Sequence, residues 1–217
     1  MKAIIFGAPG AGKGTYSARL KSDLGVETIA IGDILRESVK QNSELGKKVK
    51  TFVESGALVP DAVVVEVLKD RLQKVPNGQG FLLDGFPRTI EQAKILDGIV
   101  RPDFIILLEV PDEVIIERLS TRRVCKSCGS IYNVRFLKPK IEDKCDKCVG
   151  ELFQRNDDNP EVIKDRLRLY KNQTEPLIAY YKAKKIPFVV SITKTADSPL
   201  EPRIAEVLEN IKKLKIK

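Results

Sequence analysis

Short runs of consecutive apolar residues alternate along the chain with longer stretches in which apolar residues recur every three or four positions. The short runs predict buried strands, and they lie at 3–6, 27–31, 80–83, 104–110 and 187–192. The longer stretches predict helices, and they lie at 15–24, 61–73, 89–99, 112–120 and 161–185. This alternation is typical of a parallel sheet covered on both faces. It predicts a three-layer α/β/α protein with a five-stranded parallel sheet.

Pro176 predicts that the last helical stretch is kinked or divided in two.

Two segments interrupt this alternation, and both are longer than a simple connection requires. Residues 30–59 carry short helical patterns, and residues 121–158 contain all four cysteines of the chain. Ligands of open α/β sheets bind beyond the carboxyl ends of the strands, so we expect both insertions at that edge. The expected domains are a core of residues 1–29, 60–120 and 159–217, a helical insertion at 30–59 and a cysteine-bearing insertion at 121–158.

The stretch GAPGAGKGT connects the first predicted strand to the first predicted helix. It fits the phosphate-binding pattern G-x-x-x-x-G-K, with Gly7, Gly12 and Lys13 at the defining positions. Glycines allow backbone N–H groups to surround phosphates, while the helix start and the lysine add positive charge. The sequence therefore predicts a loop that binds the phosphates of a nucleotide.

The position that usually supplies a hydroxyl to Mg²⁺ in such a loop is Gly14 here, and the hydroxyl follows one residue later at Thr15. Magnesium would then depend on phosphates, water and a nearby carboxylate. We expect that carboxylate to be Asp84, at the end of the third predicted strand.

The charge and composition of the chain limit the kinds of ligand and catalytic site that it can have. The formal charge is +8, and ten Lys or Arg residues against four Asp or Glu lie between Arg118 and Arg155, which indicates an anionic ligand at the second insertion. The chain has no histidine, so a histidine general base, a Ser-His-Asp triad and histidine metal sites are excluded. No apolar run is long enough for a membrane span. We therefore expect a cytoplasmic protein without a membrane partner.

The cysteines form two C-x2-C pairs separated by sixteen residues, a spacing typical of a zinc site. Four thiolates would close a tetrahedral shell, so the metal would be structural. The predicted ligands are Cys125, Cys128, Cys145 and Cys148. Two disulfides or four unligated thiols are the alternatives. Zinc ribbons also bind nucleic acid, which leaves a nucleic-acid-binding ATPase as a remote alternative function.

Four motifs occur in order: GAPGAGKGT, GDILR, DGFPRT followed by Gln92, and RRVCKSCG. Together they resemble the adenylate kinase family, in the form that carries a cysteine-bearing lid, and the resemblance spans essentially the whole chain. It implies reversible, Mg²⁺-dependent phosphoryl transfer from ATP to AMP, which gives two ADP. It also implies a helical AMP-binding insertion, a zinc-binding lid, small nucleotides rather than nucleic acid as partners, and a monomer.

The resemblance also implies roles for individual residues. Those expected to bind ATP are Gly10, Ala11, Gly12, Lys13, Gly14, Thr15, Arg118, Arg122, Ile131, Tyr132 and Lys194. Those expected to bind AMP are Ile31, Arg36, Ala57, Leu58, Val59, Gly85, Phe86, Pro87, Arg88, Gln92, Arg155 and Arg166. Those expected to act in catalysis are Lys13, Asp84, Arg88, Arg122, Arg155 and Arg166, and Asp157 and Asp158 would orient the lid-side arginines.

The acceptor base is the point at which the sequence departs from the family. Members specific for adenine typically have threonine where this chain has Ile31, so a kinase for UMP or CMP is the alternative. Thr89 and Gln92 match the AMP type, and a glutamine amide offers a donor and an acceptor to an adenine edge. We therefore expect AMP as the acceptor.

Overall fold

The computed structural model describes residues 1–214, so the last three residues of the expected core segment 159–217 lie outside the described residues. Its central sheet has five parallel strands in the order β2-β3-β1-β4-β8, which confirms the predicted fold class. The strands are β1 (Lys2–Gly7), β2 (Glu27–Ala30), β3 (Phe81–Asp84), β4 (Phe104–Glu109) and β8 (Phe188–Ile192). Each lies within one or two residues of its predicted run.

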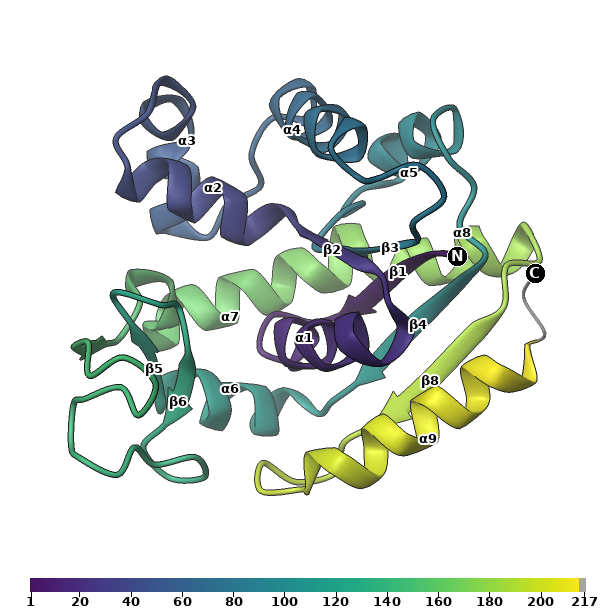
Figure 1. Cartoon of the computed structure of the whole chain (residues 1–217). Helices are drawn as coiled ribbons and strands as arrows, with labels where there is room; N and C mark the ends of the chain where they lie inside the picture. The colour runs from purple at the N-terminus through teal and green to yellow at the C-terminus, as the bar shows by residue number, and fades with distance from the viewer. Residues whose placement is uncertain (215–217) are drawn as a thin grey trace.

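Alternate side chains of the strands point to opposite faces of the sheet. Ile4 and Phe6 pack in one hydrophobic cluster with α4 (Asp61–Gln73), α5 (Ile90–Asp97) and α8 (Pro176–Ala183). Ala3 and Ile5 pack in a second cluster with α1 (Lys13–Leu24) and α9 (Leu200–Lys213). The two clusters are the two interfaces of a three-layer molecule (Figure 1).

The first insertion consists of α2 (Ile31–Lys40) and α3 (Glu44–Ser55), which pack against each other. Ile31 was expected at the end of a strand but begins α2 instead, because the apolar run continues directly into the helix. Side chains at 31, 35 and 49 are buried and join the insertion to the main core.

The second insertion follows α6 (Asp112–Ser120) and forms a small antiparallel sheet of β5 (Arg122–Cys125), β6 (Ile131–Asn133) and β7 (Leu152–Phe153). Figure 1 shows this sheet and the α2–α3 pair on the same side of the molecule. Lys40 Nζ donates a hydrogen bond of 2.9 Å to the carbonyl oxygen of Lys126, so the two insertions touch.

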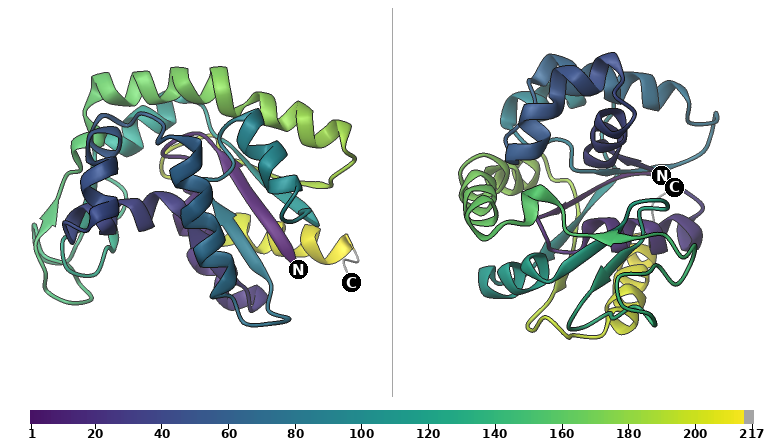
Figure 2. Two further views of the ribbon diagram at one scale, coloured as in Figure 1. Left: turned by 90° about the horizontal axis from the view of Figure 1, so that it is seen from above. Right: turned by 90° about the vertical axis from the view of Figure 1, so that its left-hand side faces the viewer.

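The chain returns to the core through a 3₁₀ turn (Asn156–Asp158), α7 (Pro160–Leu169), a π-helical turn (Tyr170–Thr174) and α8. The expected division of 161–185 is confirmed, with Pro176 as the first residue of α8, where a missing N–H costs least. The left view of Figure 2 shows α7 and α8 end to end along one edge of the molecule. No helix within residues 1–214 combines the length and apolar character needed to cross a membrane.

Candidate active site

The glycine loop lies between the end of β1 and the start of α1. Gly12 precedes the helix with a φ of 100°, a left-handed conformation that favours glycine. Lys13 turns back over the loop, and its Nζ donates to the carbonyl oxygens of Gly7 (2.7 Å) and Ala8 (3.0 Å). Burial, together with the nearby arginines, lowers the pKa of Lys13 to about 8. The ammonium is therefore held in the loop at the point where phosphates would bind.

Asp84 ends β3, which pairs directly with β1, so its carboxylate lies beside the loop. The side chain is 9% exposed, and Ser17 Oγ donates to its Oδ2 at 3.5 Å. A Cβ added at Gly14 would lie 3.9 Å from the same oxygen. Burial raises the pKa of Asp84, and the positive charge of Lys13 opposes that rise.

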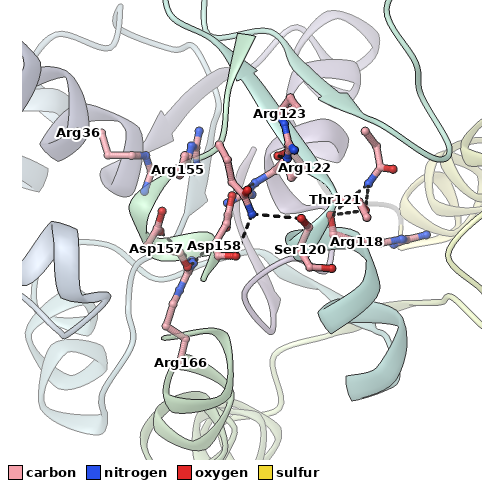
Figure 3. Close-up of polar contacts among 12 residues, drawn as sticks. Arg36, Arg118, Ser120, Thr121, Arg122, Arg123, Arg155, Asp157, Asp158 and Arg166 are labelled. Carbon is pink, nitrogen blue, oxygen red and sulfur yellow. Dashed lines mark hydrogen bonds and ion pairs between the residues drawn. The ribbon is translucent and has the colours of Figure 1, made fainter. Parts of the chain in front are cut away.

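Two consecutive carboxylates organise the arginines of the second insertion and of α7 (Figure 3). The fully buried Asp158 accepts two hydrogen bonds from Arg122, at 2.8 and 2.6 Å. Arg166 donates to the Asp157 carbonyl oxygen at 2.8 Å, lies 2.9 Å from the Asp157 carboxylate and is 3.7 Å from Asp158. The guanidinium groups from two distant segments are thereby brought together.

Asp33 joins two further arginines. Arg36 Nη2 lies 2.6 Å from Asp33 Oδ1, and Arg155 Nη2 lies 4.0 Å from the same atom. Burial alone would raise the pKa of Asp33, but Arg36 and then Arg155 outweigh it and hold the pKa below its usual value. Burial and repulsion from Arg36 lower the pKa of Arg155 to about 10, so the guanidinium remains charged at neutral pH.

Two adjoining cavities open at this cluster. The first lies against α2, α3 and α4 and is lined by Ile31, Gly32, Leu35, Arg36, Phe52, Val53, Gly56, Ala57, Leu58, Val59, Val64, Gly85, Arg88, Gln92, Asp157 and Arg166. The second lies over the glycine loop and is lined by Ile5, Phe6, Gly7, Pro9, Lys13, Gly56, Leu58, Gly85, Pro87, Arg88, Arg166, Leu169, Tyr170 and Thr174. Arg88 and Arg166 belong to both linings, so they stand where the cavities meet.

Arg88 is held from several sides. Its Nε donates to the carbonyl oxygen of Gly85 at 2.9 Å, and its own carbonyl oxygen accepts from Thr174 Oγ1 at 2.9 Å. Burial and the charge of Arg166 lower the pKa of Arg88 to about 10. The side chain remains a cation in an environment that lacks enough carboxylates to neutralise it.

Arg118 was expected to bind ATP together with Arg122, but it does not join the cluster of Arg122, Arg155 and Arg166. It points away from that cluster, and its guanidinium donates to the carbonyl oxygens of Thr195 (3.3 Å) and Ala196 (3.1 and 3.2 Å) (Figure 3). These carbonyls belong to the loop after β8 that also contains Lys194. Arg118 lies in the last turn of α6, which directs its side chain towards this loop.

Ile131 and Tyr132, expected beside the ATP base or ribose, lie on β6 of the small sheet. Ile131 is 40% exposed, whereas the Tyr132 side chain is buried beside the cysteines. The Tyr132 hydroxyl accepts from the Asp146 N–H at 2.7 Å and lies 3.4 Å from Cys145 Sγ. The Tyr132 side chain therefore packs within the cysteine cluster.

The cysteine cluster is compact. The four Sγ atoms lie within 4.8 Å of one another, and all four thiols are free. Two of the S···S separations are 3.5 Å, between Cys125 and Cys148 and between Cys128 and Cys145. A tetrahedral shell with Zn–S bonds of about 2.3 Å places sulfurs about 3.8 Å apart, so the arrangement fits a bound zinc ion.

Sequence reasoning missed three residues that organise these cavities. Asp33 was findable, because it lies three positions before Arg36 on one helix, a spacing that brings side chains together. Asp61 belongs to none of the four sequence motifs. Its carboxylate nevertheless accepts a 2.7 Å hydrogen bond from the Gln92 amide. Thr174 reaches Arg88 from 86 positions away, and no local signal indicates that contact.

Comparison with known proteins agrees with this geometry. Residues 5–186 match the family model described as "Adenylate kinase". Proteins named adenylate kinase from Caldicellulosiruptor bescii, Archaeoglobus fulgidus and Thermosipho africanus are 52%, 45% and 45% identical. The alignments cover 85%, 98% and 98% of this chain and 88%, 100% and 100% of those proteins. The chain therefore belongs to the adenylate kinase family, and it is an ATP:AMP phosphotransferase.

Proposed function

We propose that the two adjoining cavities hold the two nucleotides of reversible phosphoryl transfer, with ATP over the glycine loop and AMP in the cavity lined by Gln92. The observation that carries this proposal is that Arg88 and Arg166 line both cavities, with Lys13 at the wall of the second. Two phosphate groups that enter from opposite sides would meet at these cations. The products are two ADP.

The arginines would act by positioning and by neutralising charge. The second pKa of a phosphate monoester is about 6, so the attacking AMP oxygen is already largely ionised at neutral pH and needs no general base. Phosphoryl transfer depends on alignment and on stabilisation of charge at the moving group. Arg88 and Arg36 would bind the AMP phosphate, while Arg122, Arg155 and Arg166 would surround the transferred group. Lys13 would bind the terminal phosphates of ATP.

Magnesium would be held with ATP near Asp84. Carboxylate oxygens and water are the ligands that Mg²⁺ prefers, and Asp84 supplies a carboxylate beside the loop. A Cβ at Gly14 would contact this carboxylate at 3.9 Å, so the glycine keeps side-chain atoms away from it. The ion would neutralise part of the phosphate charge, and Asp84 would orient the water molecules around it.

The acceptor base would lie between α2 and Gln92. Ile31 is 2% exposed and lines the cavity with an alkyl group, so it supplies packing against a base rather than a hydrogen bond. Ala57, Leu58, Val59 and Gly85 complete this wall, whereas Pro87 lines the cavity over the glycine loop and Phe86 is buried in the main core. Base recognition by hydrogen bonds therefore falls chiefly to Gln92.

Residues 121–158 would form a lid stabilised by structural zinc on Cys125, Cys128, Cys145 and Cys148. Its basic residues would close over the triphosphate and exclude water, which otherwise competes as an acceptor. Both cavities are built from residues of a single chain, so we propose that a monomer is sufficient for activity.

The proposal is tested by measuring ADP formation from MgATP with AMP, dAMP, GMP, CMP and UMP as acceptors. AMP is expected to exceed the other ribonucleotides by at least about tenfold in kcat/KM, the discrimination that one bidentate amide–base contact supplies. Higher kcat/KM with UMP or CMP would overturn the assignment of AMP. Mass photometry at the assay concentration tests the monomer.

A further inference from the structure

We propose that Asp61 is a positioning residue that locks the Gln92 amide in the single orientation that recognises adenine and rejects 6-oxopurines. The inference rests on the proposed binding of AMP in the cavity lined by Gln92. Asp61 would determine base specificity without touching the nucleotide.

The Gln92 amide is held at both of its polar atoms. Its Oε1 accepts a hydrogen bond of 2.7 Å from the Arg88 backbone N–H, and its Nε2 donates one of 2.7 Å to Asp61 Oδ1. A backbone N–H only donates and a carboxylate only accepts. An amide rotated by 180° would set donor against donor at Arg88 and acceptor against acceptor at Asp61, so only one orientation is satisfied.

The frame around the amide is rigid and comes from separate elements. Gln92 is 2% exposed, and its backbone N–H donates to Thr89 Oγ1 at 3.1 Å. The Arg88 peptide is tied to Thr174 through its carbonyl oxygen. Asp61 is the first residue of α4, 31 positions before Gln92, and it lies outside the set of residues that line the cavity. Its contact with the amide therefore leaves the cavity free for the base.

The locked amide retains one N–H on Nε2 and one lone pair on Oε1. Adenine offers a matching acceptor and donor, N1 and the N6 amino group. A 6-oxopurine offers the reverse order on the same edge, with N1–H as donor and O6 as acceptor. An amide that rotates freely would pair with either base, whereas a locked amide pairs with adenine alone. Asp61 thereby converts an adaptable side chain into a selective one.

The experiment compares AMP with IMP as acceptors, because IMP keeps the size of the purine and reverses its hydrogen-bonding order. Steady-state kcat and KM are measured with saturating MgATP for the wild type, Asp61→Leu and Asp61→Asn. Both substitutions remove the charge at a similar size, but only asparagine keeps an acceptor oxygen for Gln92 Nε2. Asp112→Leu is the matched control, because Pro111–Asp112 begins α6 as Pro60–Asp61 begins α4.

For Asp61→Leu we expect the AMP-to-IMP ratio of kcat/KM to fall by about tenfold or more, the value of one oriented amide–base pair. Its KM for AMP should rise by a similar factor while kcat stays within about threefold, since the loss is in ground-state binding. Asp61→Asn should restore the ratio to within about threefold of wild type, and Asp112→Leu should leave it unchanged.

An unchanged AMP-to-IMP ratio in Asp61→Leu, with or without a lower melting temperature, would overturn the proposal, because a merely structural aspartate would affect both acceptors equally. Asp61→Ala carries the same expectation if the leucine variant does not fold. A wild-type enzyme that forms no ADP from AMP would instead overturn the proposed function, so the two failures are distinguishable.

Discussion

The buried carboxylate of Asp158 receives two parallel hydrogen bonds from Arg122, one on each oxygen, at 2.8 and 2.6 Å. Asp158 is fully buried and Arg122 is 14% exposed, so the pair is largely shielded from water. The bidentate geometry fixes the plane of the guanidinium as well as its position. One aspartate therefore determines how the first arginine of β5 faces the cleft.

Asp158→Ala should lower the free energy of unfolding by about 3 kcal/mol, because it leaves a buried guanidinium without its partner. Chemical denaturation measures the loss. Asp165→Asn is the control, since it removes a carboxylate whose partner Arg168 is 76% exposed, and it should cost less than about 1 kcal/mol. Equal losses in the two variants would show that burial of the Arg122 pair contributes no stability.

Arg88→Ala should reduce kcat by about a hundredfold or more while the fold is retained, because the guanidinium stands where the two cavities meet. Steady-state kinetics with AMP and circular dichroism measure the two effects. Arg101→Ala, at an exposed position, should change kcat by less than about twofold. A loss of under tenfold for Arg88→Ala contradicts its proposed role.

The affinity of the free enzyme for MgATP should decline above pH 8. Burial lowers the pKa of Lys13 to about 8, so its ammonium is present below this pH and is lost as the pH rises through it. Only the ammonium attracts phosphate, and kcat/KM for MgATP should fall by about tenfold per pH unit well above the pKa. Measurement of kcat/KM for MgATP from about pH 6.5 to 9.5 tests this alkaline decline. Lys13→Arg keeps its charge throughout this range, so its kcat/KM for MgATP should show no alkaline decline. A wild-type kcat/KM that stays constant to pH 9.5 contradicts the prediction.

Removal of metal from the cysteine cluster should lower the melting temperature without removing a group that contacts phosphate. Four thiolates brought close together repel one another when no cation lies between them. Calorimetry before and after chelation measures the shift, and elemental analysis should find one zinc per chain. Zinc should restore the original melting temperature, whereas Mg²⁺ should not. Identical melting temperatures for the chelated and untreated protein contradict a structural zinc.

Gly46→Ala should destabilise the first insertion. A Cβ at this position would lie 2.0 Å from the Ser38 carbonyl oxygen, so α2 and α3 would have to separate. We expect a loss of about 1–3 kcal/mol in the free energy of unfolding, and a larger rise in KM for AMP than for ATP, because α2 carries Arg36. Gly98→Ala, where the nearest atom would be 3.5 Å away, should be close to neutral in both measurements.

Features that depend on neighbouring residues could be predicted from the amino-acid sequence alone. The glycine loop lies between a strand and a helix because β1 and α1 are encoded by adjacent patterns, and the two thiols of each C-x2-C pair are neighbours along the chain. The motif residues also indicated most of the cleft arginines, since a family resemblance transfers positions along the chain. These features needed no knowledge of how distant segments pack.

Which of these residues face one another depends on how distant segments of the chain pack. Arg118 appears equivalent to Arg122 in sequence, but α6 directs it to the loop after β8, 77 and 78 positions away. The contact of Asp61 with Gln92 joins two helices, and the contact of Thr174 with Arg88 depends on the π-helical turn. Side-chain direction at such distances is determined by how helices pack on the sheet. That packing depends on the whole core, which no short stretch of sequence specifies.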